Sequence, residues 1–394
     1  MSIERRCLVA LFVMLTAGGS ARAQIPSSEY GARRDSVARH IRDGLVVAFG
    51  AREPVDDLAI FRQLPGFAYL TGVAESDAVF LMTAQAGRVQ RALLFLPAKD
   101  PRMALYTGFL PAPAEVRARY GLELRTMEGL GPVVDSMLAQ GLAVWNVPDV
   151  ASRDFLRLDT LTRATRFFER LRAARSKLEV RSAQALLDSL RVRKSAAEQA
   201  LLRRAVEITM KGHEAAIRAV APDRSEAVAQ AESDRVFRML GDGPSYGAIV
   251  GSGPNSTSFH YRANNRIMRA GEVVVMDMGA AYQGYAADIT RTVPVSGQFT
   301  PEQRTIYDIV LASQKAAETV GRAGAPVARG DSAIRAVHAE ALTRLGLIEA
   351  PDALIDAPWT RDCSQRPLSC RQVFLFMAHG PGHGIGLEVH DPGG

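Results

Sequence analysis

The sequence predicts two domains, the first of which is an α/β layer. At 394 residues the chain is longer than the roughly 250 residues at which a single hydrophobic core usually stops growing. In its first half, short apolar runs bounded by Gly, Pro and Asp alternate with helical patterns, which is typical of strands and helices packed in layers. The composition, 47% hydrophobic and 23% charged, is that of a globular protein and excludes a disordered chain, a collagen and a disulfide knot.

The charge balance argues against a nucleic-acid partner. Lys and Arg number 48 and Asp and Glu number 42, and the excess of 6 is spread along the chain, whereas a nucleic-acid interface concentrates positive charge on one face. The segment from about residue 160 to 205 is basic and helical in pattern. We interpret it as a solvated helix surface and the seam between the two domains.

Residues 1–23 predict a cleavable signal peptide. Arg5 and Arg6 precede an apolar core of nine residues, and Ala21-Arg22-Ala23 forms a cleavage site with small residues at its two ends. The core is too short to span a bilayer, which takes about 20 apolar residues; a buried N-terminal helix is the alternative. We therefore expect a periplasmic or secreted protein without a membrane anchor.

Two cysteines remain after removal of the signal peptide. Cys363 and Cys370 lie in a loop-like stretch that is rich in Pro, Ser and charge, and we treat about residues 355–372 as an insertion. In an oxidising compartment this pair predicts a local disulfide. Two free thiols or a soft metal site are the alternatives.

Four strands and three helices are predicted in the first half. The strands are Leu45–Phe49, Ala78–Met82, Ala92–Leu96 and Leu142–Trp145, and the helices cover Ser27–Arg42, Glu115–Tyr120 and Val133–Gln140.

Helices of the second half carry start signals. Ser195 begins one capping box and Thr300 another, each with Glu or Gln three residues later, and a third helix is predicted from Asp331. His213 lies within the apolar pattern of the first of these helices. We interpret it as a packed or surface histidine and not as a ligand.

Asp277 and Asp288 flank a predicted hairpin. Asp277 ends the apolar run from Val273, and the chain is predicted to reverse between Tyr282 and Gln283. That turn would place the two aspartates opposite each other, with Cβ atoms about 4.5–5.5 Å apart. Two carboxylates so close repel each other, so they need a metal ion or another partner. The alternative is that Asp277 only ends a strand and Asp288 pairs with Arg291.

Three of the seven histidines of the chain, His379, His383 and His390, fall within twelve residues. The glycines and Pro381 among them make a continuous helix improbable. We therefore predict a strand that enters a glycine-rich turn, where imidazoles and backbone surround a ligand; a chance cluster on a surface loop is the alternative. A second glycine-rich stretch, from Gly251, delivers His260 at its end.

Two nucleotide-binding motifs do not occur. The sequence has no Walker loop and no dinucleotide-binding fingerprint. Nucleotide chemistry therefore has no support.

Together these motifs resemble the creatinase/prolidase/aminopeptidase P superfamily of metallopeptidases, and most closely the Xaa-Pro aminopeptidases. The matching runs are 61–72, 193–198, 250–261, 276–279, 284–294 and 379–392. The resemblance covers nearly all of the chain after the signal peptide. It implies a creatinase/prolidase-type α/β domain over residues 24–172 and an α+β "pita-bread" catalytic domain over residues 173–394.

The resemblance also implies a chemistry. Members of this family hold two divalent metal ions with two Asp, one His and two Glu, and the matching residues here are Asp277, Asp288 and His383. We expect Mn²⁺, with Zn²⁺ or Co²⁺ as alternatives. His260 and His390 would donate hydrogen bonds or shuttle protons, and His379 would lie in the substrate pocket.

The implied activity is hydrolysis of the bond between an N-terminal residue and a following proline, through a hydroxide that bridges the two ions. The expected substrates are peptides with proline at the second position, and a homo-oligomer is expected. An Xaa-Pro dipeptidase (prolidase) is the near alternative. A catalytically dead binding module is another, which the retained aspartates and histidines disfavour.

One departure from the family concerns the two glutamates, which would lie beyond position 394. Glu388 falls at a position that the family does not use for metal. We therefore expect a C-terminally incomplete pita-bread domain with three of the five ligands. The 394-residue chain is then expected to bind metal poorly and to be inactive, whereas its full-length parent is active.

Overall fold

The computed structural model describes residues 24–54, 61–98, 110–150, 162–355, 370–377 and 380–393. The predicted signal peptide, Cys363 and His379 lie outside these ranges. Cys370 is buried and disulfide-bonded. None of the described helices is long and apolar enough to cross a membrane.

The first half is a six-stranded mixed sheet with the order β4-β3-β2-β1-β5-β6. The strands β1, β2 and β3 pair antiparallel, whereas β4, β5 and β6 join in parallel. The strand bounds are β1 Gly44–Phe49, β2 Val79–Gln85, β3 Arg88–Leu96, β4 Glu123–Thr126, β5 Val144–Val147 and β6 Val180–Ser182. The four predicted strands are confirmed. The edge strand β6 belongs to this sheet although it lies after residue 172, where the first domain was predicted to end.

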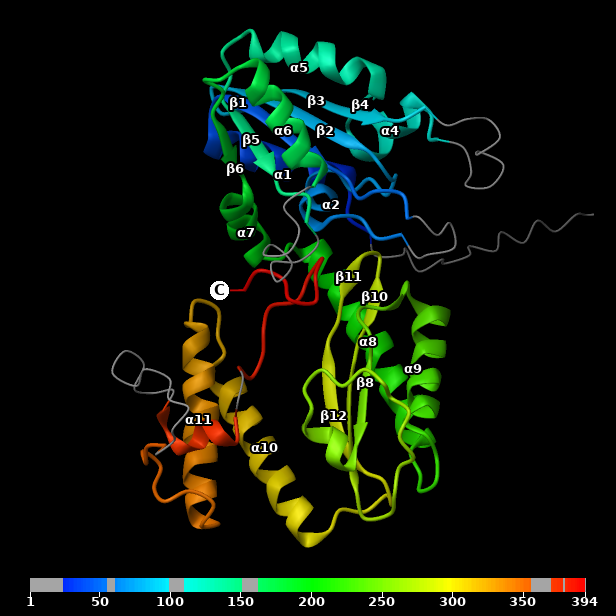
Figure 1. Cartoon of the computed structure of the whole chain (residues 1–394), viewed down its shortest axis with the longest axis vertical. Coiled ribbons are helices and arrows are strands. Elements are labelled where there is room, and N and C mark those ends of the chain that lie inside the picture. Colours follow the sequence, from blue (N-terminus) through cyan, green and yellow to red (C-terminus); the bar gives the residue numbers. More distant parts are fainter. Residues whose placement is uncertain are drawn as a thin grey trace, which may run out of the picture.

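Helices cover both faces of this sheet (Figure 1). Their bounds are α1 Ser27–Ile41, α2 Pro65–Thr71, α4 Pro113–Tyr120, α5 Leu130–Leu138, α6 Arg163–Ala174 and α7 Gln184–Val192. Because alternate residues of a strand point to opposite faces, Val46 and Ala48 of β1 pack with α1, α2 and α7, while Leu45 and Val47 pack with α5 and α6. The three predicted helices of this half are confirmed.

The second half places two long helices against short antiparallel strands. The helices α8 (Ala196–Ala219) and α9 (Glu226–Leu240) pack on two three-stranded sheets, β12-β9-β8 and β11-β10-β7. The strands are β7 Gly243–Pro244, β8 Ile249–Ser252, β9 Val273–Met278, β10 Ala280–Tyr282, β11 Tyr285–Ala286 and β12 Ile289–Pro294. Gly212 of α8 lets the helix approach the buried Phe237 of α9, because a Cβ at this position would overlap the Phe237 ring.

The helices α10 (Pro301–Val320) and α11 (Val327–Arg344) form a pair beside these strands (Figure 1). The capping boxes at Ser195 and Thr300 are confirmed. The third helix begins at Val327, four residues before the predicted Asp331, directly after the extended N-cap residue Pro326. The C-terminal segment then returns from α11 to the junction of the two halves, where it meets α7 (Figure 1).

The hairpin between β10 and β11 turns one residue later than predicted. Tyr282 pairs with Tyr285, and Gln283 and Gly284 both have positive φ, 49° and 80°. Two consecutive residues with positive φ are typical of a type I′ turn, which needs glycine or a tolerant residue. The register is therefore shifted, and Asp277 of β9 pairs with Thr290 and not with Asp288.

Candidate active site

A cavity of about 2190 Å³ lies between the two halves and collects most of the predicted site residues. The second half contributes Asp277, Asp288, His260, His383 and His390 to its lining. The first half contributes the segment that includes Arg62 and Gln63.

The two aspartates lie on the same face of the β9-β12 pair. Asp288 stands two residues before Thr290, the partner of Asp277, so it is a diagonal neighbour of Asp277 on one face of the sheet. The predicted direct opposition is thus wrong because the turn lies one residue further along. The predicted proximity of the carboxylates is confirmed, because a shift by two residues in the facing strand keeps the two side chains on the same face.

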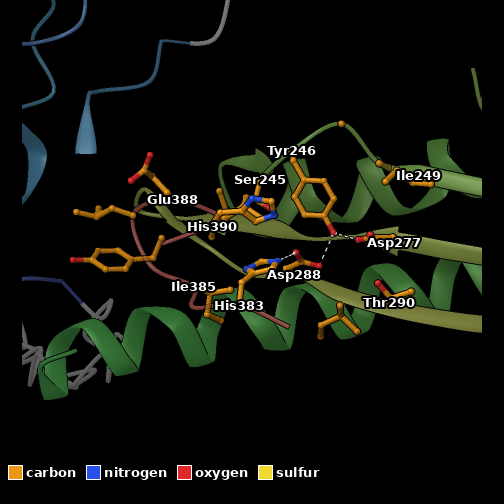
Figure 2. Close-up of a pocket in the computed structure, with 18 of the residues that line it drawn as sticks. Ser245, Tyr246, Ile249, Asp277, Asp288, Thr290, His383, Ile385, Glu388 and His390 are labelled. Atoms are coloured by element: carbon orange, nitrogen blue, oxygen red, sulfur yellow. Dashed lines mark hydrogen bonds and ion pairs between the residues drawn. The ribbon is translucent and has the colours of Figure 1, made fainter. Parts of the chain in front are cut away.

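One hydroxyl bridges the two carboxylates. The Tyr246 hydroxyl hydrogen-bonds to Asp277 Oδ1 and lies 2.9 Å from Asp288 Oδ1 (Figure 2). Burial and the two nearby carboxylates raise the pKa of Tyr246 far above its usual range, so the phenol keeps its proton and donates it. Burial also raises the pKa of Asp277; the Tyr246 hydrogen bond opposes this and the Asp288 charge adds to it.

The tyrosine is held by the loop that precedes it. Ser245 donates its hydroxyl to the Ala287 carbonyl at 2.8 Å and its backbone N–H to the Gly279 carbonyl at 2.8 Å. Gly279 leaves the room for this contact, because a Cβ there would overlap the Ala287 carbonyl. The loop is therefore hydrogen-bonded to Gly279, just after the end of β9, and to Ala287, just before Asp288.

An arginine of the first half supports the same loop from outside. Arg62 donates to the carbonyls of Pro244 and Ser245, the latter at 3.0 Å. Neither Arg62 nor Tyr246 was predicted as a site residue. A lone arginine and a tyrosine in a short turn carry no spacing signal. The contacts of Arg62 join segments more than 180 residues apart, and those of Tyr246 join a loop to two separate strand ends.

Two of the predicted histidines lie against each other beside Asp288. His383 Nε2 is 3.1 Å from Asp288 Oδ2, and the rings of His383 and His390 meet edge to face with centroids 4.1 Å apart (Figure 2). His260 is exposed at the end of the 3₁₀ turn Gly253–Thr257 and lines the same cavity. The alternative pairing of Asp288 with Arg291 does not occur in the described part of the chain, where Arg291 donates to the Thr290 carbonyl at 2.8 Å.

The donor set suits a divalent cation, because carboxylate oxygens and an imidazole are ligands that Mn²⁺, Zn²⁺ and Co²⁺ accept. Asp277 and Asp288 already aim at one point, which the Tyr246 hydroxyl reaches. The His383 imidazole does not point to the same place, because its Nε2 contacts the other oxygen of Asp288. Within the part of the chain that the structure describes, no three His, Cys, Asp or Glu side chains form a closed metal-binding group.

His213 lies behind the site and is packed, as predicted. Its side chain is buried in α8, and its Nε2 lies 2.9 Å from the Ile289 carbonyl, next to Asp288. Since a carbonyl only accepts, this nitrogen carries the hydrogen. Burial lowers the pKa of His213, which favours the neutral form of the imidazole in the folded protein.

Comparison with known proteins identifies the family. Residues 200–393 match metallopeptidase family M24, and residues 30–145 match the aminopeptidase P N-terminal domain. The Xaa-Pro aminopeptidase of Escherichia coli is 30% identical over 385 residues, which cover 94% of this chain and 82% of the relative. That of Haemophilus influenzae is 29% identical over 381 residues, with the same coverage of both chains.

Solved structures agree with this match. The low-pH form of E. coli aminopeptidase P superposes with a TM-score of 0.76 at 28% identity and covers 94% of this chain and 83% of that one. The proline aminopeptidase P II of Yersinia pestis gives a TM-score of 0.75 at 27% identity, with the same coverage of both chains. The predicted fold class is confirmed: a creatinase/prolidase-type α/β domain followed by an α+β pita-bread domain. The chain therefore belongs to the M24 metallopeptidase family, in its aminopeptidase P group.

Proposed function

We propose that the full-length parent protein is a metal-dependent aminopeptidase that releases an N-terminal residue from peptides with proline at the second position. The observation that carries the proposal is the convergence of Asp277, Asp288 and His383 in one cavity, in a chain of the aminopeptidase P group. The relatives that match the chain over most of its length are named Xaa-Pro aminopeptidases. None of those reported above is named a dipeptidase, so the prolidase alternative is not favoured.

The residues that would hold the metal ions are the two aspartates and His383. We propose Mn²⁺ as the resident ion; a zinc-substituted E. coli aminopeptidase P has been solved with product. When bound, a pair of divalent ions supplies Lewis acidity to the peptide carbonyl and activates water at neutral pH.

The remaining chemistry belongs to the side chains of this chain. Tyr246 keeps its proton and donates to the carboxylates, which fixes their orientation. His390 and His260 face the same cavity, and an imidazole can hold or release a proton near neutral pH. They are the groups that we propose to donate hydrogen bonds to the carbonyl oxygen or to protonate the leaving nitrogen.

Proline imposes a particular demand on such a site. The Xaa-Pro bond is a tertiary amide without an N–H, and the pyrrolidine ring fixes φ. A peptidase that recognises an N–H at the scissile bond would fail with this substrate. A site built from carboxylates, imidazoles and metal ions needs no such hydrogen bond.

The test compares three peptides with the full-length parent protein after metal removal and reloading with Mn²⁺, Zn²⁺ or Co²⁺. We expect release of arginine from Arg-Pro-Pro, little release from Arg-Ala-Pro, and slower cleavage of the dipeptide Arg-Pro. Equal cleavage of the alanine peptide would overturn the proline preference. Preference for the dipeptide would favour a prolidase, and no cleavage with any ion would overturn the proposal.

A further inference from the structure

Four charged side chains meet where the segment between the domains touches the C-terminal loop. Arg191, at the end of α7, lies 2.8 Å from Glu388 Oε2 and also bonds to Asp391 Oδ1. Lys194, just before α8, lies 2.8 Å from Asp391 Oδ2 and donates to the Pro392 carbonyl. Two cations thus face two carboxylates, and the cluster is neutral as a whole.

The centre of this cluster is removed from water. The side chain of Asp391 is 2% exposed and that of Arg191 is 4% exposed. A buried carboxylate is stable only when it is paired and hydrogen-bonded, and removal of one partner leaves an uncompensated buried charge. The position of Asp391 therefore depends on Arg191 and Lys194.

The loop from residue 383 to 391 is built around that carboxylate. The Asp391 N–H donates to the Gly384 carbonyl at 2.9 Å, and the Glu388 N–H donates to Asp391 Oδ1 at 3.2 Å. A Cβ at position 386 would overlap the Asp391 carboxylate, so Gly386 leaves the room that this carboxylate occupies. Through these hydrogen bonds Asp391 closes residues 383–391 into a compact loop, the histidine loop.

The two ends of the histidine loop carry His383 and His390. His383 precedes Gly384, and His390 precedes Asp391. The backbone hydrogen bond from the Asp391 N–H to the Gly384 carbonyl therefore brings the two imidazoles close together. Their rings lie in contact, and His383 reaches Asp288. Whatever fixes Asp391 also fixes the separation of these imidazoles.

We propose that Arg191 and Lys194 are positioning residues: by pinning the Asp391 carboxylate, the interdomain segment sets the geometry of His383 and His390. The inference rests on the proposed function only in the role that it gives these histidines. The pinning itself belongs to the metal-free chain. The site then depends on a segment that lies outside the catalytic sheet.

The first test measures hydrogen exchange of the metal-free protein. We expect Arg191→Met and Lys194→Met to speed exchange of the Glu388 and Asp391 amides about tenfold or more, because the acceptors of their hydrogen bonds lose support. Amides of β9 should keep their wild-type rates. Arg193→Met is the matched control, since Arg193 is an exposed arginine of the same segment, and it should change nothing.

Unchanged loop exchange in folded Arg191→Met and Lys194→Met would overturn the proposal, as would an equal effect of Arg193→Met. Lys194 is 13% exposed, so its variant carries the test if Arg191→Met does not fold. Arg191→Lys should recover part of the protection, because it restores the charge without the two-pronged geometry.

The second test is kinetic and uses the full-length parent protein. We expect kcat to fall about tenfold in Lys194→Met with little change in KM, because misplaced imidazoles affect the transition state more than binding. A rise in KM alone would contradict a positioning role. If wild type proves inactive, the proposed function fails, while the exchange result still decides the role of Arg191 and Lys194.

Discussion

The imidazole of His383 lies 3.1 Å from the carboxylate of Asp288, although the two residues come from distant segments of the chain. The other oxygen of this carboxylate faces the Tyr246 hydroxyl. Asp288 is thus the residue through which the strand β12, the tyrosine loop and the histidine loop meet. Changes at Asp288 should affect the site more than changes at any of its neighbours.

Replacement of Asp288 by asparagine in the full-length parent protein should abolish metal binding and lower activity at least about 100-fold, the upper end of what loss of an outer partner costs. An amide is a poorer ligand than a carboxylate and removes one negative charge from the site. Isothermal titration with Mn²⁺ and a peptidase assay check this. Asp308→Asn on α10, where the carboxylate is exposed and paired with Arg304, should behave as wild type.

Replacement of Tyr246 by phenylalanine should lower the free energy of unfolding of the metal-free protein by about 1–3 kcal/mol, because two half-buried carboxylates lose their common donor. Activity should fall about 10–100-fold, as for other groups that orient metal ligands. Urea denaturation and the peptide assay measure the two effects. Tyr307→Phe, whose ring packs on Phe299 outside the site, serves as the control; equal effects of the two variants would contradict the assigned role.

His213 should make stability depend on pH. Its pKa is lowered in the folded protein, so below about pH 6.5 the unfolded chain binds a proton that the folded chain does not. The free energy of unfolding then falls as pH falls, by at most about 1.4 kcal/mol per pH unit for this one proton. Denaturation between about pH 5 and 7.5 should show a weaker slope for His213→Asn than for wild type. Identical slopes would contradict the prediction.

Two glycines on helices should respond oppositely to alanine. Gly212→Ala drives a methyl group into the buried Phe237 ring and should cost about 1–3 kcal/mol or more through overpacking. Gly330 of α11 meets only the Ala317 Cβ at 3.9 Å, so Gly330→Ala should stabilise the protein by about 0.4–1 kcal/mol. Thermal or chemical denaturation gives both values, and the same sign for both would contradict the packing argument.

Much of the fold could be predicted from local patterns. The strands β1 and β2 and the second half of β3 are buried on both faces, so they occur as continuous apolar runs. The capping boxes at Ser195 and Thr300 mark the first residues of two helices. The hairpin was predicted, but its centre was not. The positive φ at Gln283 comes from the turn that Gly284 and the flanking strands impose, and glutamine gives no sign of it.

The candidate site could be predicted only where a motif carries it. Asp277, Asp288, His383 and His390 stand in recognisable runs, and the structure brings them together. Tyr246 and Arg191 could not be found in this way. Their importance comes from tertiary contacts that cross from one segment to another, and such contacts leave no periodicity in the sequence.

The contact between Arg62 and the carbonyls of Pro244 and Ser245 has an evolutionary consequence. It makes the amino-terminal half part of the scaffold beneath the loop that carries Tyr246 and not merely a neighbour. A chimera that joins this half of one family member to the peptidase half of another would have to preserve the arginine and the loop it reaches. The two halves are therefore expected to have changed together over the history of the family.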